Sequence, residues 1–152
     1  MAVILIAVGT IYFLNRGSGF YQETPSGDLR GPDFINGTYF NVTLTSLIPG
    51  QDSSFQIMNS NLFLMDLRAP NGTVGRMDFK YVAWHDGHAV GHDIIEGYDL
   101  SVKLAGGDDA LGAGDTFGLL STDGPLAKGE WMVILWFYPM MEYAATLTVT
   151  VV

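Results

Sequence analysis

The sequence predicts a mainly β protein, an antiparallel β-sandwich of about seven to eight strands preceded by a short hydrophobic N-terminal helix. Two observations predict the sandwich. Thr, Val, Tyr, Phe and Gly dominate after residue 20, where strong helix formers are scarce. Short apolar or alternating runs also follow one another, with turn residues between them. An uncharged apolar run over residues 1–14 predicts the helix.

The composition limits the classes of function. The chain has 152 residues, enough for one domain with a hydrophobic core. Its formal net charge is −9, and only seven residues are Lys or Arg. Because nucleic-acid binding depends on clustered cations, we expect no nucleic-acid partner. Cysteine is absent, so neither disulfides nor thiolate chemistry are available.

Residues 1–14 are expected to form a hydrophobic assembly helix. The helix would be about 21 Å long, short of the roughly 30 Å hydrocarbon core of a bilayer. No basic residue precedes it and no small-residue cleavage site follows it, whereas a secretory signal has both. Since it is hydrophobic all round, we expect it to pack against copies of itself. The expected contact residues are Val3, Ile4, Leu5, Ile6, Val8, Ile11, Tyr12, Phe13 and Leu14.

Residues 15–34 are predicted to be a linker, because Gly, Ser, Pro and Asp recur there and cannot continue a helix. Gly17 and Gly19 would act as the hinge between the helix and the rest of the chain. The β-sandwich domain is expected to occupy residues 35–152.

The first half of this domain is predicted to contain four strands. Residues 39–48 alternate, with Phe40, Val42 and Leu44 on one face and polar side chains on the other. Residues 54–58, 62–67 and 74–84 form the next runs. Between the last two, the turn sequence at residues 70–73 predicts a hairpin.

The second half is predicted to contain four more strands, at residues 98–104, 116–120, 131–138 and 145–151. A turn rich in Gly and Asp separates the first two. In the last strand, Ala145, Leu147, Val149 and Val151 face inward while Thr residues face outward. The number and spacing of these runs indicate an immunoglobulin-like sandwich.

The strand at residues 131–138 is apolar on both faces. Trp131 and every second residue after it form one face, and the other face is formed by Met132, Ile134, Trp136 and Tyr138. A sandwich strand has only one inner face, so the second row is a candidate interface with another protein surface or with the apolar helix. The alternative is that a loop of the same domain covers it.

Three sequons occur within a short stretch, at Asn36, Asn41 and Asn71. Each could accept an N-glycan on an exported chain. Three sequons so close together indicate an exposed extracellular surface.

All three histidines, His85, His88 and His92, lie in one polar segment that is interpreted as an exposed loop. Imidazole is a common metal ligand, but the intervening glycines do not suit the helix of a zinc-protease motif. Whether these residues bind a metal therefore stays open. The chain has no nucleophile elbow, phosphate-binding glycine loop or evident acid–base pair, so we expect no enzymatic activity and no cofactor.

Taken together, these features resemble archaeal type IV pilins and archaellins. Residues 2–14 are similar to the C-terminal part of their assembly helix. Residues 111–119 followed by 126–133 resemble their paired turns of leucine, glycine and acid before a strand, and residues 145–152 resemble their closing strand.

The resemblance implies a homopolymer in which the N-terminal helices bundle along the filament axis and the sandwiches face outward. Such a subunit contacts the membrane before assembly, carries N-glycans, and serves adhesion or motility at the cell surface.

Three alternatives remain open. The first is a membrane-anchored sandwich that binds an envelope partner such as the surface layer, or a glycan. The second is a filament held by donor-strand exchange, in which residues 2–14 form a strand in a neighbour's sheet. The third is a metal-dependent enzyme that uses His85, His88 and His92.

Overall fold

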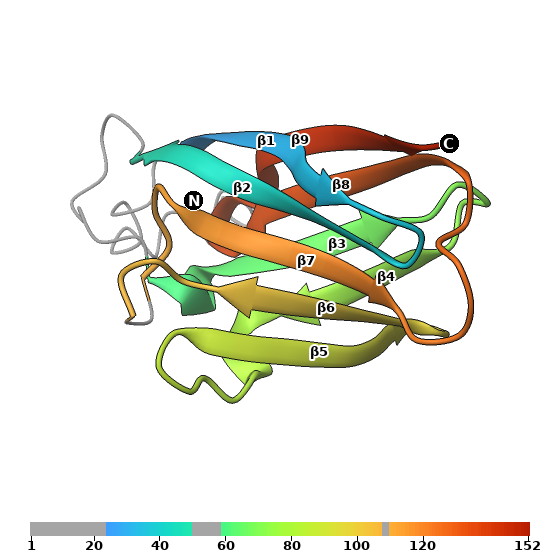
Figure 1. Ribbon diagram of the computed structural model, residues 1–152. Coiled ribbons are helices and arrows are strands. Elements are labelled where there is room, and N and C mark those ends of the chain that lie inside the picture. The colour runs from blue at the N-terminus through green and yellow to red at the C-terminus, as the bar shows by residue number, and fades with distance from the viewer. Residues whose placement is uncertain (1–23, 50–58, 108–109) are drawn as a thin grey trace, which may run out of the picture.

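A computed structural model describes residues 24–49, 59–107 and 110–152, which fold into two antiparallel sheets packed face to face (Figure 1). The mainly β prediction is confirmed. The five-stranded sheet has the order β1-β2-β7-β6-β5 and the four-stranded sheet the order β4-β3-β8-β9. The strands are β1 (Ser26–Ile35), β2 (Tyr39–Ile48), β3 (Phe63–Arg68), β4 (Val74–Asp78), β5 (His88–Ile95), β6 (Tyr98–Lys103), β7 (Asp115–Ser121), β8 (Gly129–Phe137) and β9 (Glu142–Val151).

Several predicted elements fall outside these described residues. They are the N-terminal helix over residues 1–14 with its assembly side chains, the hinge at Gly17 and Gly19, and the strand over residues 54–58.

The core lies between the sheets and follows the predicted alternation. Phe40, Val42 and Leu44 of β2 are buried, as are Trp131 and every second residue after it in β8. In β9 the inward row is buried except for the half-buried Leu147, and the Thr residues between its members are exposed. Burying one aliphatic or aromatic side chain stabilises a fold by about 1.5–3 kcal/mol, so this alternation selects the register of each strand.

Trp131 joins the two layers. Its ring meets Phe40 of β2 edge-on at 6.2 Å and Tyr98 of β6 at 5.0 Å between ring centroids. The indole Nε1 donates a hydrogen bond to the carbonyl of Ala127 at 2.9 Å. The one polar atom of this fully buried side chain is thereby satisfied.

The edge strands of the two sheets lie beside each other, β1 beside β9 and β4 beside β5. At the second of these edges the approach is very close. A Cβ atom on Gly75 of β4 would stand 2.3 Å from the carbonyl oxygen of Ile94 in β5, so only glycine fits there.

Two predicted segments differ from the structure. Residues 26–34 of the expected linker belong to β1, whose backbone pairs with β2 although its sequence is rich in Gly, Pro and Asp. The expected loop around the histidines contains a tight turn at Asp86 and Gly87, both with positive φ, and then strand β5. Pairing with β6 supplies the backbone hydrogen bonds that the local sequence does not signal.

The strand predicted over residues 74–84 is also shorter than expected. β4 ends at Asp78, whose carboxylate accepts a hydrogen bond from the backbone N–H of Lys80 at 3.1 Å. This contact starts a 3₁₀ turn, η3 (Phe79–Tyr81). Side-chain acceptors of this kind compete with the strand ladder.

The two ends of the sandwich differ. At one end, which we call the entry end, the described chain begins at Thr24, and three 3₁₀ turns lie there: η2 (Ser60–Leu62), η3 and η4 (Tyr138–Met140). The far end carries the β1–β2 and β3–β4 hairpin turns and the loop between β7 and β8 (Figure 1). The side chain of Thr24 donates a hydrogen bond to Glu142 at the start of β9, which fixes the entry point.

Asp115, at the start of β7, holds the preceding loop at the entry end. Its carboxylate is buried and accepts hydrogen bonds from the backbone N–H groups of Ala105 and Gly112, each at 2.8 Å. Burial raises the pKa of the Asp115 carboxyl above its ordinary value, while the two donors act in the opposite direction.

We expect the raised pKa of Asp115 to make the free energy of unfolding depend on pH. A raised folded-state pKa favours folding fully below the unfolded pKa of about 3.9, and that contribution is lost as the pH rises through the folded pKa. The free energy of unfolding of the wild type minus that of Asp115→Asn should therefore increase from about pH 7 to about pH 4. Urea denaturation measures this difference, and a value independent of pH would contradict the assignment.

Asp99→Asn serves as a control of opposite sign. The backbone N–H of Asp93 and the ring of His92 lower the pKa of Asp99, so its contribution is present above about pH 3.9 and is lost as the pH falls further. The corresponding difference for Asp99→Asn should decrease only below about pH 4.

Candidate interaction surface at the entry end

Large apolar side chains are exposed around the 3₁₀ turns of the entry end. Tyr81, Tyr138, Met141 and Tyr143 each have more than half of their surface exposed, at 78%, 56%, 52% and 55%. We call these four residues the entry-end surface. Their exposure follows from the turns: η3 buries Phe79 and turns Tyr81 outward, and Met141 ends η4 in the left-handed conformation with φ 51°.

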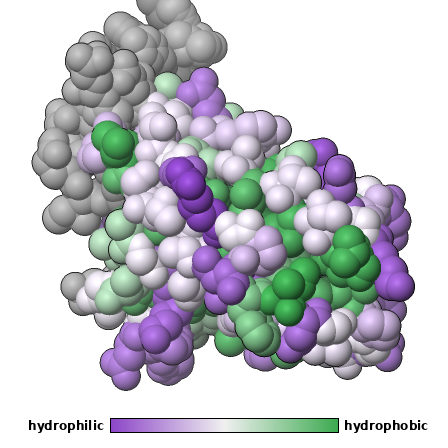
Figure 2. All heavy atoms as spheres, turned by 45° about the horizontal axis from the view of Figure 1, so that its top comes forward, coloured by the Kyte–Doolittle hydropathy of each residue, from purple (hydrophilic) through white to green (hydrophobic). Residues whose placement is uncertain are grey.

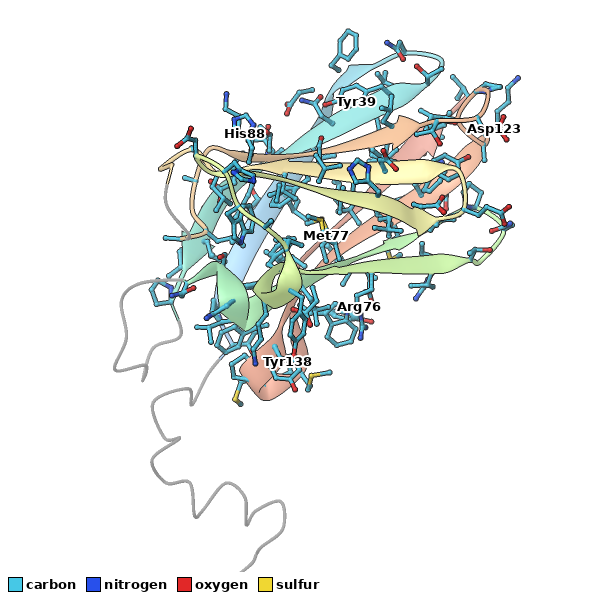
Figure 3. All side chains as sticks on the ribbon, turned by 90° about the horizontal axis from the view of Figure 1, so that it is seen from below. Tyr39, Arg76, Met77, His88, Asp123 and Tyr138 are labelled. Carbon is cyan, nitrogen blue, oxygen red and sulfur yellow. The ribbon has the colours of Figure 1, made fainter. Side chains whose placement is uncertain are left out.

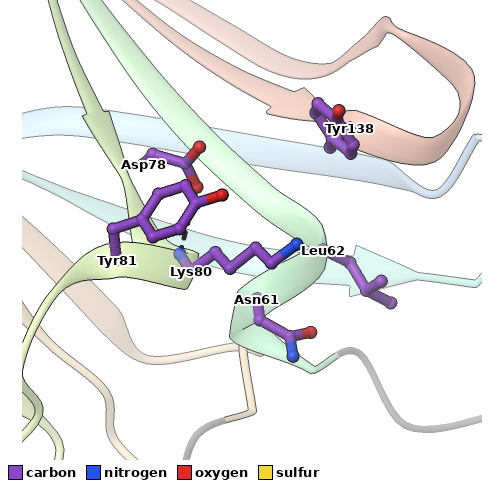
Figure 4. Close-up of a pocket in the computed structure, with 6 residues that line it drawn as sticks. All are labelled: Asn61, Leu62, Asp78, Lys80, Tyr81 and Tyr138. Carbon is purple, nitrogen blue, oxygen red and sulfur yellow. Dashed lines mark hydrogen bonds between the residues drawn. The ribbon is translucent and has the colours of Figure 1, made fainter.

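A groove of about 280 Å³ separates Tyr81 from Tyr138 (Figure 4). Asn61, Leu62, Asp78 and Lys80 line the rest of it. The ammonium group of Lys80 lies 5.7 Å from the ring centroid of Tyr81, within the range of a cation–π contact. The groove thus combines two aromatic side chains with an amide, a carboxylate and a cation.

Next to this groove, the outer face of the four-stranded sheet carries a polar cluster. Asp66 of β3 lies opposite Arg76 of β4, and the two side chains form a bidentate pair at 2.6 and 2.9 Å. Trp136 of β8 donates its Nε1–H to the same carboxylate at 3.0 Å. The hydrogen bonds that Arg76 donates to Asp66 raise the pKa of the Arg76 guanidinium above its ordinary value.

Trp136 connects this cluster to the entry-end surface. Its ring meets Tyr143 of β9 edge-on, with 4.6 Å between the ring centroids. A register shift between β8 and β9 after Leu135 brings Tyr143, rather than the residue that regular pairing would give, opposite Trp136. Arg76, Asp66, Trp136 and Tyr143 therefore form a continuous row across all four strands.

The structure divides the predicted interface residues between these features. Met132, Ile134 and Trp136 lie on the outer face of β8, whereas Tyr138 lies in η4 beside the groove. Ile134 is buried, with 3% of its surface exposed, although it lies outside the core between the sheets. Part of the outer apolar row is thus covered within this chain, and Tyr138 is its exposed member.

Sequence reasoning missed Asp66, Arg76, Tyr81 and Tyr143. The apolar runs around Asp66 and Tyr143 indicate strands, but nothing local signals that these residues meet Trp136. Tyr81 falls within the predicted strand over residues 74–84, whereas β4 ends at Asp78, three residues before it. The one available signal was Asp66, a carboxylate inside an otherwise apolar run.

The sequons occupy two kinds of place. Asn36 and Asn71 are exposed in hairpin turns of the far end, and each Oδ1 accepts the N–H of the Thr two residues later, at 2.8 and 2.9 Å. Asn41 lies within β2, paired with β7, and its Oδ1 is buried without a hydrogen-bond partner. The first two side chains can be reached by a modifying enzyme, and Asn41 is poorly placed for it.

Exposed apolar side chains also occur away from the entry end. Phe34 and Ile35 of β1 and Leu120 of β7 are exposed on the five-stranded sheet toward the far end. On the face shown in Figure 2, apolar residues gather toward one side and polar residues surround them.

The three histidines do not converge. His85 and His88 flank the tight turn and pair through their backbones, while the ring of His92 lies 3.0 Å from Asp99. Among the described residues no group of three or more His, Asp or Glu side chains is arranged to hold a metal ion. The same part of the chain contains no helix with the length and apolarity needed to span a bilayer.

Comparison with family models, curated proteins and solved structures found no match to this chain. The function is therefore inferred from the sequence and from the surfaces of the protein.

We expect Arg76 to stabilise the buried carboxylate of Asp66, with which it forms the ion pair on the outer sheet. Arg76→Leu leaves the Asp66 carboxylate, which has only 8% of its side chain exposed, without its cation. This should lower the free energy of unfolding by about 2 kcal/mol, less than for a fully buried pair because Arg76 is half-exposed.

The double variant Asp66→Leu/Arg76→Leu removes the unpaired charge and should recover most of that loss. Urea denaturation of the wild type, Asp66→Leu, Arg76→Leu and the double variant measures the coupling. If the double variant were as unstable as both single changes added together, the pair would not act as a unit.

Proposed function

We propose that this protein is a structural subunit of an extracellular filament of the archaeal type IV pilus kind. It would polymerise through its hydrophobic N-terminal segment, residues 1–14, with the sandwich outside, and would serve adhesion or motility. The resemblance of the sequence to pilins and archaellins suggests this class. The observation that carries the proposal is the difference between the two ends of the sandwich.

The chain enters the sandwich at Thr24, beside Glu142, at the end that exposes Tyr81, Tyr138, Met141 and Tyr143. An apolar segment that precedes Thr24 in the chain is therefore joined to the end with the exposed aromatic side chains. Exposed apolar surface of this kind is typical of protein or membrane contacts. A subunit whose entry end packs toward a filament axis would bury the apolar segment and the entry-end surface together.

The far end suits the outside of such a filament. Asn36 and Asn71 project from its hairpin turns, and the loop after β7 carries the exposed Asp123 (Figure 3). We propose that N-glycans on Asn36 and Asn71 face the solvent, and that Asn41 is not modified. The end that exposes the aromatic side chains and the end that carries Asn36 and Asn71 are thus opposite ends of the sandwich.

The strand order supports an immunoglobulin-like topology for the sandwich. In the order β1-β2-β7-β6 over β3-β8-β9, the strands correspond to A-B-E-D over C-F-G of that fold. Within the described residues both sheets consist of strands of the chain itself, and apolar side chains of both sheets are buried between them. A filament held by donor-strand exchange needs an incomplete acceptor sheet, so this observation favours assembly through residues 1–14 outside the sandwich.

The groove between Tyr81 and Tyr138 favours one second candidate, a membrane-anchored sandwich that binds an envelope partner. Electron microscopy of native, unextracted material separates the two. Fibres with a rod of density on the axis and sandwiches outside would support the filament proposal. Discrete particles that stay monodisperse in detergent would contradict it and favour the anchored module.

We expect Ile6→Asp to abolish assembly, because it places an uncompensated charge among packed apolar segments. The measurement is the yield of sedimentable fibres from cells that produce the variant. Val74→Asp is the matched control, since Val74 is an exposed apolar residue at the far end, with 51% of its surface exposed. Normal fibre yield with Ile6→Asp would exclude residues 1–14 as the assembly element.

A further inference from the structure

A second concave surface lies on the outer face of the five-stranded sheet, in the layer opposite the Asp66–Arg76 cluster. It is a trough of about 230 Å³ lined mainly by side chains of β2, β5, β6 and β7. In Figure 3, Tyr39 and His88 lie on the same side of the molecule, away from Arg76 and Tyr138. The residues that line it are Tyr39, His88, Ala89, Val90, Ser101, Val102, Lys103, Thr116 and Gly118.

The register of the sheet places donor groups side by side along one wall. His88 of β5 pairs with Lys103 of β6, and Lys103 pairs with Thr116 of β7. Directly opposed side chains of neighbouring strands have Cβ atoms about 4.5–5.5 Å apart, so these three heads reach a common ligand. None of the three side chains makes a hydrogen bond or ion pair with another described residue that would occupy its donors.

The trough lacks carboxylates, although the chain has 16 Asp and Glu against seven Lys and Arg. Acids on the same face already have partners. Asp33 accepts a hydrogen bond from the hydroxyl of Thr43, which pairs with Thr116. Asp99 accepts from the N–H of Asp93 and contacts His92, while Asp28 pairs with Arg30 at the β1 side. The lining therefore complements a negative charge in a protein that is otherwise acidic.

The second row of the trough has a different character. Val90 is exposed over 46% of its surface and forms an apolar wall. Ser101 lies beside Gly118, to whose carbonyl its hydroxyl donates a long hydrogen bond of 3.4 Å, so its oxygen can still accept one. The hydroxyl of Tyr39 lies over Gly118, where a Cβ atom would stand 2.3 Å from it.

From this arrangement we infer that the trough binds an acidic sugar residue. Lys103 and Thr116, with His88 beside them, receive the carboxylate; Ser101 and Tyr39 meet ring hydroxyls; and Val90 contacts the apolar C–H face of the ring. A volume below that of sites for drug-sized ligands suits one such ring of a longer acidic glycan. The inference does not rest on filament assembly, because the trough and the entry-end surface lie on different layers.

The test is saturation-transfer NMR on the full-length chain in detergent, at about pH 7.5. Glucuronate, glucose and sulfate are the three probes. We expect glucuronate to bind and both glucose and sulfate to bind at least about tenfold more weakly, since each lacks one half of the recognition. Equal binding of glucose, equal binding of sulfate, or no binding of glucuronate would each overturn the inference.

Two variants locate the site. Lys103→Gln should weaken glucuronate binding about tenfold through loss of one charge-assisted hydrogen bond. Gly118→Ala should also weaken it, because the new methyl group displaces the Tyr39 hydroxyl. Lys128→Gln is the matched control, since Lys128 is an exposed lysine in the far-end loop and its loss changes the net charge equally. An equal effect of Lys103→Gln and Lys128→Gln would place the binding elsewhere.

Discussion

Strand β8 carries apolar side chains on both faces, whereas a two-layer sandwich offers it only one inner face. The row that begins at Trp131 satisfies the inner face and joins the two sheets through Phe40 and Tyr98. The opposite row has to be covered from outside. On the outer face of the four-stranded sheet this cover includes Asp66, Arg76 and Tyr143. Asp66 and Tyr143 contact Trp136 directly, and Arg76 pairs with Asp66.

The cover is incomplete where β8 ends. Beyond Phe137 the chain leaves the sheet through η4, and the alternation that buried one residue in two no longer holds. Tyr138 and Met141 are therefore exposed, beside Tyr81 and the entry point of the chain. Strand β8 thus supplies the centre of the core, and the residues that directly follow it supply part of the entry-end surface.

Strands with strict alternation were predictable from the sequence, and strands made by pairing were not. β2 and β9 and the β3–β4 hairpin follow the pattern of their own residues. β1 and β5 are rich in Gly, Asp or His and become strands because β2 and β6 offer their backbone edges. The polar cluster was invisible for a related reason: Asp66, Arg76 and Tyr143 come from three different strands, and only the register and the shift after Leu135 bring them to Trp136.

The contact between Gly75 and Ile94 affects how the edge strands of the sandwich can pair with other chains. An open sandwich exposes unpaired backbone along its outer strands, and such edges recruit identical chains into disordered aggregates. Here each outer strand of one sheet lies against an outer strand of the other, and Gly75 brings β4 and β5 too close for a foreign strand to enter between them. Edge-to-edge pairing of identical chains between β4 and β5 is thereby disfavoured.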